Sequence, residues 1–529
     1  MGVVKMGKDR FLKGALILTV AGLMVKVIGS VNRILLSRLL GGEGIGLYQM
    51  AYPIYLLMLS VCSAGVPVAV SIIVAEKVAK DDYVQAHRIF KVTLGLMAVF
   101  GLLFALTLYG LAGFLVSSGW IRDSRAYYAL VVLTPAVFFS SILASFRGYF
   151  QGYQMMIPPA VSQILEQLVR VLVMIGLAYF LLPRGLEFAA AGAAFGAVPG
   201  GLMGLLVLTW FYRKARKDWK RRIKEQAETV EESVGSIARR LILLAIPVSC
   251  ANLLIPVTSS IDMLLVPNGL GRAGFGVEAA TTLFGYLTGM AQPLMMMATI
   301  PTMSLAASLV PAVSEACTLH RPDEILRKTS SAFKICMLVV VPASVGMWTL
   351  AGPISGTLYG TMKAAPVIAH LAPSIAFLGV FQVTTGALQG FGKTLIPMWN
   401  MLFGAVVKAI AVWQLTSLPA FHVLGAAWAS NLNFALVAAI NILFLYRSGI
   451  PFPLWDSLKI LLASLCMGMA GRAVALFFMD KSGVLAALVS GMTVSGLVYV
   501  AAVILSGCLT REEAARLPVL GKYLRKFWH

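Results

Sequence analysis

Ionisable residues are scarce in this chain of 529 residues, and the acidic ones are scarcest: Asp and Glu number 22, against 43 Lys and Arg. Only 12% of the residues are charged and 59% are apolar. Soluble domains average about 25% charged and about 45–50% apolar residues, so this composition excludes a water-soluble globular protein. The formal charge of +21 does not indicate a nucleic-acid-binding protein either, because the bases are not interleaved with aromatic residues on polar surfaces.

The residues that build metal, redox and catalytic sites are also few. The six cysteines contain no C-x-x-C pair and the five histidines are dispersed, so we expect no disulfide framework, no metal site and no cofactor. Ala387-x4-Gly392-Lys393-Thr394 fits a relaxed phosphate-loop pattern, but it lies between two apolar runs and not after a buried strand. No Ser/His/Asp grouping is evident, so we expect no enzyme. The first apolar run contains Lys26 and lacks a small-residue cleavage site, which predicts a retained first span and not a cleaved signal.

Long apolar runs dominate the rest of the sequence. A helix that crosses the hydrocarbon core needs about 20 mostly apolar residues, and these runs lack the ten-residue alternation of a membrane β-barrel. The predicted fold is therefore an all-α integral membrane protein with fourteen transmembrane helices. The predicted spans are 13–39, 47–75, 91–117, 127–149, 157–182, 187–212, 239–266, 280–312, 332–352, 366–389, 395–418, 422–446, 457–479 and 484–507.

The basic residues predict the orientation of these spans. Of the 43 Lys and Arg, 30 fall at the termini and in the loops on their side, 6 fall in the opposite loops, and 7 fall within spans. Cytoplasmic loops carry the excess of Lys and Arg, so both termini are expected on the cytoplasmic side of a bacterial cytoplasmic membrane.

Four regions follow from the span count. We predict an N-terminal six-helix lobe over 1–212, a basic cytoplasmic connector over 213–238, a second six-helix lobe over 239–446, and two final helices with a cytoplasmic tail over 447–529. The connector carries many bases and no proline, which favours a surface segment held near anionic membrane lipids over a regulatory site. We expect a monomer.

An internal repeat relates the two predicted lobes. Gln151-Gly152-Tyr153 with Pro159 recurs 238 residues later as Gln389-Gly390-Phe391 with Pro397, and the same offset carries Arg170 onto Lys408. Six spans separate the copies, so they share one orientation. This predicts pseudo-symmetric lobes related by a two-fold axis along the membrane normal, with a cavity between them.

Three cations lie at one predicted depth. Lys26, Arg170 and Lys408 each lie 13 residues into a span that starts on the cytoplasmic side, which at about 1.5 Å per residue is about 20 Å deep. An ionisable group at mid-membrane costs about 2.5–3.5 kcal/mol and usually faces a cavity or a partner. Glu166 precedes Arg170 by one turn and forms an i,i+4 acid–base pair with it, which is either part of the binding site or a structural pair.

Three further ionisable residues complete the predicted site. Arg33 and Asp262 lie nearer the outer ends of their spans, and Arg33 faces either the cavity or the outer headgroups. Arg472 lies deep in the thirteenth span, where a groove could hold an anionic lipid. Buried bases outnumber buried acids seven to two, which favours an anionic substrate, phosphate above all, over a cationic drug.

Several motifs resemble a known family. They are Gly29-x2-Asn32-Arg33-x4-Arg38-Leu39-Leu40-Gly41, Gly44-x-Gly46-Leu47-Tyr48-Gln49, Tyr52-Pro53, Ala64-Gly65-Val66-Pro67, the turn Arg147-Gly148-Tyr149-Phe150-Gln151-Gly152 and its copy at Gln389-Gly390. Together they resemble the polysaccharide-biosynthesis branch of the multidrug/oligosaccharidyl-lipid/polysaccharide (MOP) flippase superfamily. Within it, the chain is most similar to the stage V sporulation group, which is similar to the lipid II flippases.

The resemblance implies fourteen helices in two lobes, a cationic cavity, alternating access and a lipid-tail groove along the last two helices. Lys26 falls where the lipid II flippases carry a cavity arginine in the first helix. Their cavity arginines of the second and eighth helices have no basic match, because 47–75 and 280–312 contain no Lys or Arg. The implied partners are a lipid-linked sugar diphosphate and cell-wall synthesis proteins.

The predicted function is therefore a flippase that moves an undecaprenyl-diphosphate-linked sugar, a peptidoglycan or spore-cortex precursor, across the membrane with an ion gradient or membrane potential. Two alternatives stay open: a cation-coupled multidrug exporter of the same superfamily, and a non-transporting scaffold for envelope assembly.

Overall fold

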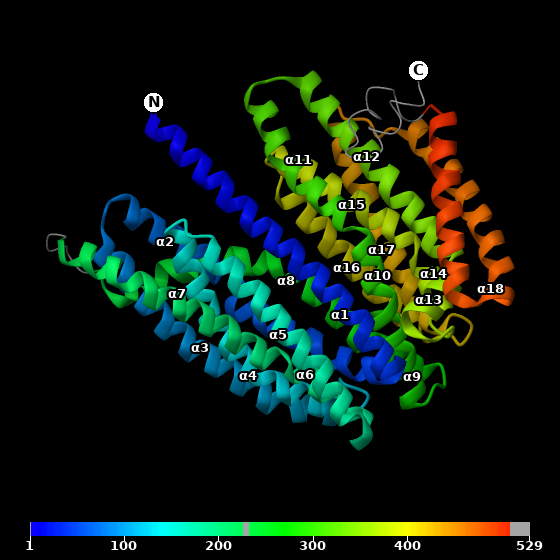
Figure 1. Ribbon diagram of the computed structural model, residues 1–529, viewed down its shortest axis with the longest axis horizontal. Helices are drawn as coiled ribbons and strands as arrows, with labels where there is room; N and C mark the ends of the chain where they lie inside the picture. The colour runs from blue at the N-terminus through cyan, green and yellow to red at the C-terminus, as the bar shows by residue number, and fades with distance from the viewer. Residues whose placement is uncertain (1, 226–231, 508–529) are drawn as a thin grey trace. The chain divides into compact units, whose positions relative to one another are not determined.

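The computed structural model describes residues 2–225 and 232–507, and helices joined by short turns make up this part of the chain (Figure 1). The helices are α1 Gly2–Ser63, α2 Val66–Ala79, α3 Tyr83–Ser117, α4 Ala126–Gly152, α5 Ile157–Leu181, α6 Leu186–Phe195, α7 Ala197–Glu225, α8 Val234–Arg272, α9 Val277–Gly285, α10 Gln292–Ala298, α11 Ile300–Thr318, α12 Pro322–Thr349, α13 Ala351–Tyr359, α14 Ala365–Leu371, α15 Pro373–Gly390, α16 Leu395–Leu415, α17 His422–Arg447 and α18 Leu454–Leu505, with the 3-10 turn η1 Leu182–Arg184 and the π-helical turn η2 Tyr286–Ala291. Residues 226–231 of the predicted connector and the tail bases Arg511, Arg516, Lys522, Arg525 and Lys526 lie outside the described residues.

Eleven helical stretches of the described chain are long and apolar enough to cross a membrane. Two of them, Leu16–Ala79 with 64 residues and Leu454–Leu505 with 52, far exceed the length of one span. Each contains a glycine with positive φ, 68° at Gly41 and 85° at Gly483, where the chain passes from one helix into another. Glycine is required there because a Cβ strongly disfavours this conformation. The all-α membrane fold is confirmed, and the count of fourteen spans stays a prediction.

Two of the predicted spans are interrupted helices. The span 47–75 breaks after Ser63, and the next helix starts at Val66-Pro67. The span 280–312 divides into α9, η2, α10 and α11, and prolines stand in the first turns of α10 and α11. Proline has no N–H to donate and clashes with the preceding turn, so it starts a helix more readily than it continues one. Both predicted spans are therefore interrupted helices in the structure, a feature that the span prediction does not specify.

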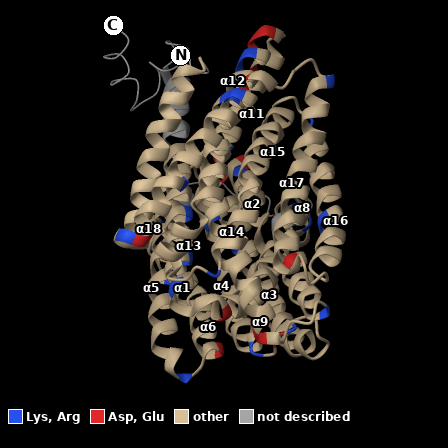
Figure 2. Cartoon of the chain, turned by 90° about the vertical axis from the view of Figure 1, so that its right-hand side faces the viewer, with Lys and Arg blue, Asp and Glu red and all other residues tan. Residues whose placement is uncertain are grey.

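Large apolar side chains cover the outside of the helices. Leu172 is 71% exposed and Phe180 is 75% exposed, while alanine and glycine fill many contacts between helices. Figure 2 shows long uncharged stretches of helix with most Lys, Arg, Asp and Glu toward the helix ends. Exposed apolar surfaces with small residues at helix contacts are typical of helices that face lipid. The chain is a multi-pass membrane protein.

The chain divides into two compact units, Met1–Gly289 and Met290–His529, and the boundary lies within η2. Helix α8 belongs to the first unit because it packs against α1, α2 and α3, and α9 packs against α1. The boundary between the compact units, at Gly289, thus lies further along the chain than residue 239, where the second lobe is predicted to start. The predicted regions 1–212, 213–238, 239–446 and 447–529 stay a prediction.

Glycine contacts inside each unit support the internal repeat. In the first unit, Gly148 and Gly152 of α4 lie against α2, and a Cβ on either would stand 2.7 Å from a valine Cβ. In the second unit, Gly386 and Gly390 of α15 lie against α11, where a Cβ would stand 2.7 Å from the Ala306 carbonyl oxygen and from the Val313 Cβ. The two G-x3-G pairs are 238 residues apart, the offset that the sequence repeat predicts.

Candidate anion-binding site

Two arginines share one carboxylate inside the first unit. Arg147 Nη2 lies 2.6 Å from Glu166 Oε2, and Arg170 Nη2 lies 2.7 Å from Glu166 Oε1. The Ser162 hydroxyl oxygen lies 3.3 Å from the same Arg147 nitrogen. The charged side chains are only 14–19% exposed. We call Arg147, Glu166 and Arg170 the arginine cluster.

Local helix geometry explains the cluster. Glu166 and Arg170 are one turn apart on α5, so their side chains meet, as the sequence predicted. Arg147 stands five residues before the end of α4, and a short turn joins α4 to α5. Because the two helices meet at this turn, the long side chain of Arg147 reaches the glutamate from the other side.

The cluster carries one excess positive charge, since two guanidinium groups face one carboxylate. The Nε atoms of Arg147 and Arg170 are also buried and make no hydrogen bond. A buried donor without an acceptor is costly, and guanidinium groups suit the oxygens of phosphate. The cluster therefore has the charge and the unused donors to bind an anionic group.

A row of tyrosines on α1 lies beside the cluster. The rings of Tyr48 and Tyr52 stack with centroids 5.3 Å apart, and Tyr52 and Tyr55 are 5.8 Å apart. Arg170 is close enough to interact electrostatically with all three. The guanidinium of Arg33 lies 5.9 Å from the centroid of the half-buried Tyr52 ring. Arg33 thus joins the same region through an aromatic contact and is its third cation, after Arg147 and Arg170.

Helix α1, which carries Lys26, packs along α5. The amide nitrogen of Asn32 lies 2.7 Å from the Met174 sulfur, and a Cβ on Gly29 would stand 3.3 Å from the Gln167 amide nitrogen. Lys26, one turn before Gly29, has an exposed side chain. It is not a member of the arginine cluster. Asp262 is buried on α8.

The repeat-related positions of the second unit have different chemistry. Arg147, Ser162, Glu166 and Arg170 correspond, 238 residues later, to Thr385, Asn400, Gly404 and Lys408. Lys408 is 3% exposed on α16, and a Cβ on Gly404 would clash with Asn433 Oδ1.

Amides and hydroxyls replace the ion pairs around these positions. Asn400 Nδ2 donates to Asn441 Oδ1 at 2.8 Å, and Asn441 Nδ2 donates to the hydroxyls of Thr384 and Thr385 at 3.2 Å each. Arg472, on α18, has an exposed side chain, and its neighbour Gly471 packs against Ser495 in the second half of that helix.

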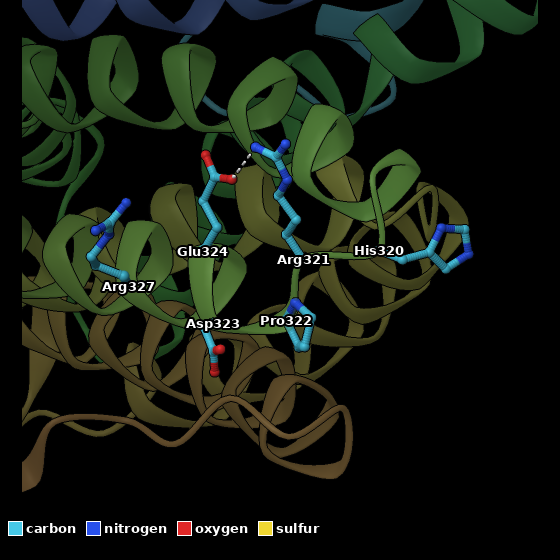
Figure 3. Close-up of a pocket in the computed structure, with 6 residues that line it drawn as sticks. All are labelled: His320, Arg321, Pro322, Asp323, Glu324 and Arg327. Carbon is cyan, nitrogen blue, oxygen red and sulfur yellow. Dashed lines mark hydrogen bonds and ion pairs between the residues drawn. The ribbon is translucent and has the colours of Figure 1, made fainter.

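A surface pocket lies at the turn between α11 and α12. Its lining residues are His320, Arg321, Pro322, Asp323, Glu324 and Arg327. Arg321 points toward Glu324, and their charged atoms are 3.4 Å apart (Figure 3). Arg321, Asp323 and Arg327 are exposed, so water competes for any charge there. The pocket contains none of the predicted site residues.

Sequence reasoning missed Arg147 as a site residue and assigned it to a cytoplasmic turn. The available signal was that Arg147 and Glu166 flank the same short turn, Arg147 about one and a half helical turns before it and Glu166 about two and a half turns after it. The aromatic row was visible only as part of a family motif. Depth along a helix can be counted from sequence, whereas the direction of an arginine side chain depends on what packs beside it.

Comparisons with known proteins identify the family. The family model described as "Polysaccharide biosynthesis protein" matches residues 11–317. The chain belongs to this family. A second model, MatE, matches residues 287–413. The family is a branch of the MOP superfamily, and the chain is a transporter of that superfamily.

Three similar proteins support this assignment. Stage V sporulation protein B of Bacillus subtilis is 30% identical over 98% of this chain and 100% of its own length. The lipid II flippase MurJ of Bacillus subtilis is 26% identical over 76% of each chain. A solved structure of lipid II flippase MurJ in an inward closed conformation has a TM-score of 0.69 and 15% identity, and covers 93% of this chain and 98% of its own. The fold predicted from sequence is thus shown to be that of MOP-superfamily transporters.

Proposed function

We propose that this transporter is a flippase that moves an undecaprenyl-diphosphate-linked sugar, a peptidoglycan or spore-cortex precursor, across the cytoplasmic membrane by alternating access. Both termini are proposed to lie in the cytoplasm. No covalent bond changes in this process. The membrane potential or an ion gradient would supply the driving force.

The observation that carries the proposal is the arginine cluster: a mostly buried group of side chains with one excess positive charge and an unpaired Nε–H donor on Arg170, within a membrane-spanning unit. An exporter of cationic drugs would need excess negative charge at such a place. A diphosphate has the opposite charge and several acceptor oxygens for guanidinium groups. The similarity to a protein named lipid II flippase supports a lipid-linked substrate.

Reconstitution in vesicles tests the proposal directly. The purified protein is inserted into liposomes that contain fluorescent lipid II. Leaflet exchange is then measured as the fraction of the fluorescent lipid II that a membrane-impermeant quencher can reach. We expect exchange to depend on the protein and to be lost in Arg170→Ala and in Lys408→Ala, although both variants still reach the membrane folded. If both single variants exchange lipid II at the wild-type rate, the cationic-site proposal is wrong.

A cation-coupled multidrug exporter is the second candidate, and the MatE match over residues 287–413 favours it. Overexpression in a drug-sensitive strain separates the two functions. Raised resistance to cationic drugs, without lipid II exchange in vesicles, would support the exporter and contradict the flippase.

A further inference from the structure

The arginine cluster contains one more arginine than an acid–base pair needs. Glu166 uses one carboxylate oxygen for Arg170 and the other for Arg147. Arg170 alone with Glu166 would form a neutral pair with little attraction for an anion. With Arg147 present, the negative charge of Glu166 is shared between two cations, and one positive charge is left over.

The second unit provides an internal comparison. Glu166 corresponds to Gly404 and Arg147 corresponds to Thr385, so the acid and the extra arginine are both absent there. Arg170 corresponds to Lys408, which leaves a single cation. The repeat-related positions therefore carry a formal charge of +1 in each unit, reached by three charged residues in one and by a single residue in the other.

We infer that Arg147 is a positioning residue for anion binding: it holds and neutralises Glu166, so that the positive charge of Arg170 stays available to a phosphate group. This inference rests on the proposed function for the identity of the natural ligand. It assigns Arg147 a role through Glu166 and not through direct contact with substrate.

The magnitude follows from Coulomb's law. Loss of one unit charge at about 7 Å, with an effective dielectric constant of about 20, weakens anion binding by roughly 10-fold to 100-fold. Substitution of Arg147 by glutamine should have this effect. Substitution of both Arg147 and Glu166 by glutamine returns the charge to +1, so the double variant should recover binding to within about threefold of wild type.

The experiment uses the full-length protein in nanodiscs and two probes, inorganic diphosphate and undecaprenyl diphosphate. Affinity is measured for wild type, Arg147→Gln, Glu166→Gln and the double variant, with Arg184→Gln as the matched control, because Arg184 is exposed on η1 away from the cluster. Circular dichroism and size-exclusion profiles establish that each variant is folded. We expect Arg147→Gln to bind the probes roughly 10-fold to 100-fold more weakly than wild type, and the double variant to bind them within about threefold of wild type. Glu166→Gln should bind at least as tightly as wild type, and Arg184→Gln should bind with unchanged affinity.

Recovery of anion binding in the double variant is the decisive result, because a purely structural role of Arg147 predicts no recovery. If Arg147 only fastened α4 to α5, removal of its partner Glu166 as well would restore nothing. Unchanged binding of both probes in Arg147→Gln, or a double variant as weak as Arg147→Gln, would overturn the inference.

The two probes separate the inference from the proposed function. Charge-dependent binding of inorganic diphosphate with no binding of undecaprenyl diphosphate would support the role of Arg147 and contradict the lipid-linked substrate. Wild-type protein that binds neither probe would overturn both.

Discussion

Replacement of Gly148 by valine tests the close approach of α2 and α4 on which the first unit is built. A Cβ at this position would stand 2.7 Å from the Val70 Cβ, 2.8 Å from the Pro67 carbonyl oxygen and 3.0 Å from the Pro67 Cα. Ordinary contacts of this kind are near 3.5–4.0 Å, so the two helices must separate by several tenths of an ångström or more. Overpacking of this sort costs about 1–3 kcal/mol, and the better helix propensity of valine returns only about 0.4 kcal/mol. The net destabilisation is thus about 0.6–2.6 kcal/mol.

Thermal unfolding of the detergent-solubilised protein, followed by fluorescence-detected size-exclusion chromatography, measures this change. At about 2–4 °C per kcal/mol, the apparent Tm should fall by several degrees. Gly95→Val is the matched control, because Gly95 is an exposed helical glycine and a Cβ added there would have no atom within 4 Å. If the repeat is real, Gly386→Val should lower the apparent Tm by about as much as Gly148→Val does. A Gly148→Val protein that melts within a degree of Gly95→Val would refute the helix packing described above.

Two further predictions concern the ends of the helices in the first unit. Asp123, in the turn between α3 and α4, has a pKa below its ordinary value of 3.8: burial alone would raise the pKa, but hydrogen bonds from Arg125 and Thr281 outweigh burial. The carboxylate therefore stabilises the fold above about pH 4 and loses this effect as the pH falls through the lowered pKa. When melting temperatures are measured over a series of pH values, the Asp123→Asn variant should lack the part of the decrease at acid pH that this carboxylate causes. A variant whose melting temperature depends on pH as that of the wild type does would contradict this prediction. Lys77 Nζ, on α2, lies 2.5 Å from Glu232 Oε1, just before α8. Lys77→Glu should destabilise by about 0–1 kcal/mol and Lys77→Glu/Glu232→Lys should restore the melting temperature; no recovery in the exchanged pair would show that the ion pair does not join the two helices.

The sequence was sufficient for the features that depend on local pattern. Hydropathy determined the helical membrane fold, because a segment in lipid must satisfy its backbone hydrogen bonds internally and a helix does so. The 238-residue offset located the repeat, and the i,i+4 spacing placed Glu166 against Arg170, which the 2.7 Å contact confirms. The predicted spans missed the breaks at Pro67 and Pro301, because mean hydropathy does not register where a helix is interrupted.

Tertiary structure decided the features that join distant segments. It placed Arg147 against Glu166 across the α4–α5 turn, the guanidinium of Arg33 over Tyr52, and α8 within the first compact unit. None of these follows from periodicity, because a side chain's partner on another helix depends on how closely the backbones approach. That approach is set at positions such as Gly148, where the absence of a side chain lets α4 meet α2. The sequence located the charged residues that interrupt the apolar runs, and packing determined which of them meet.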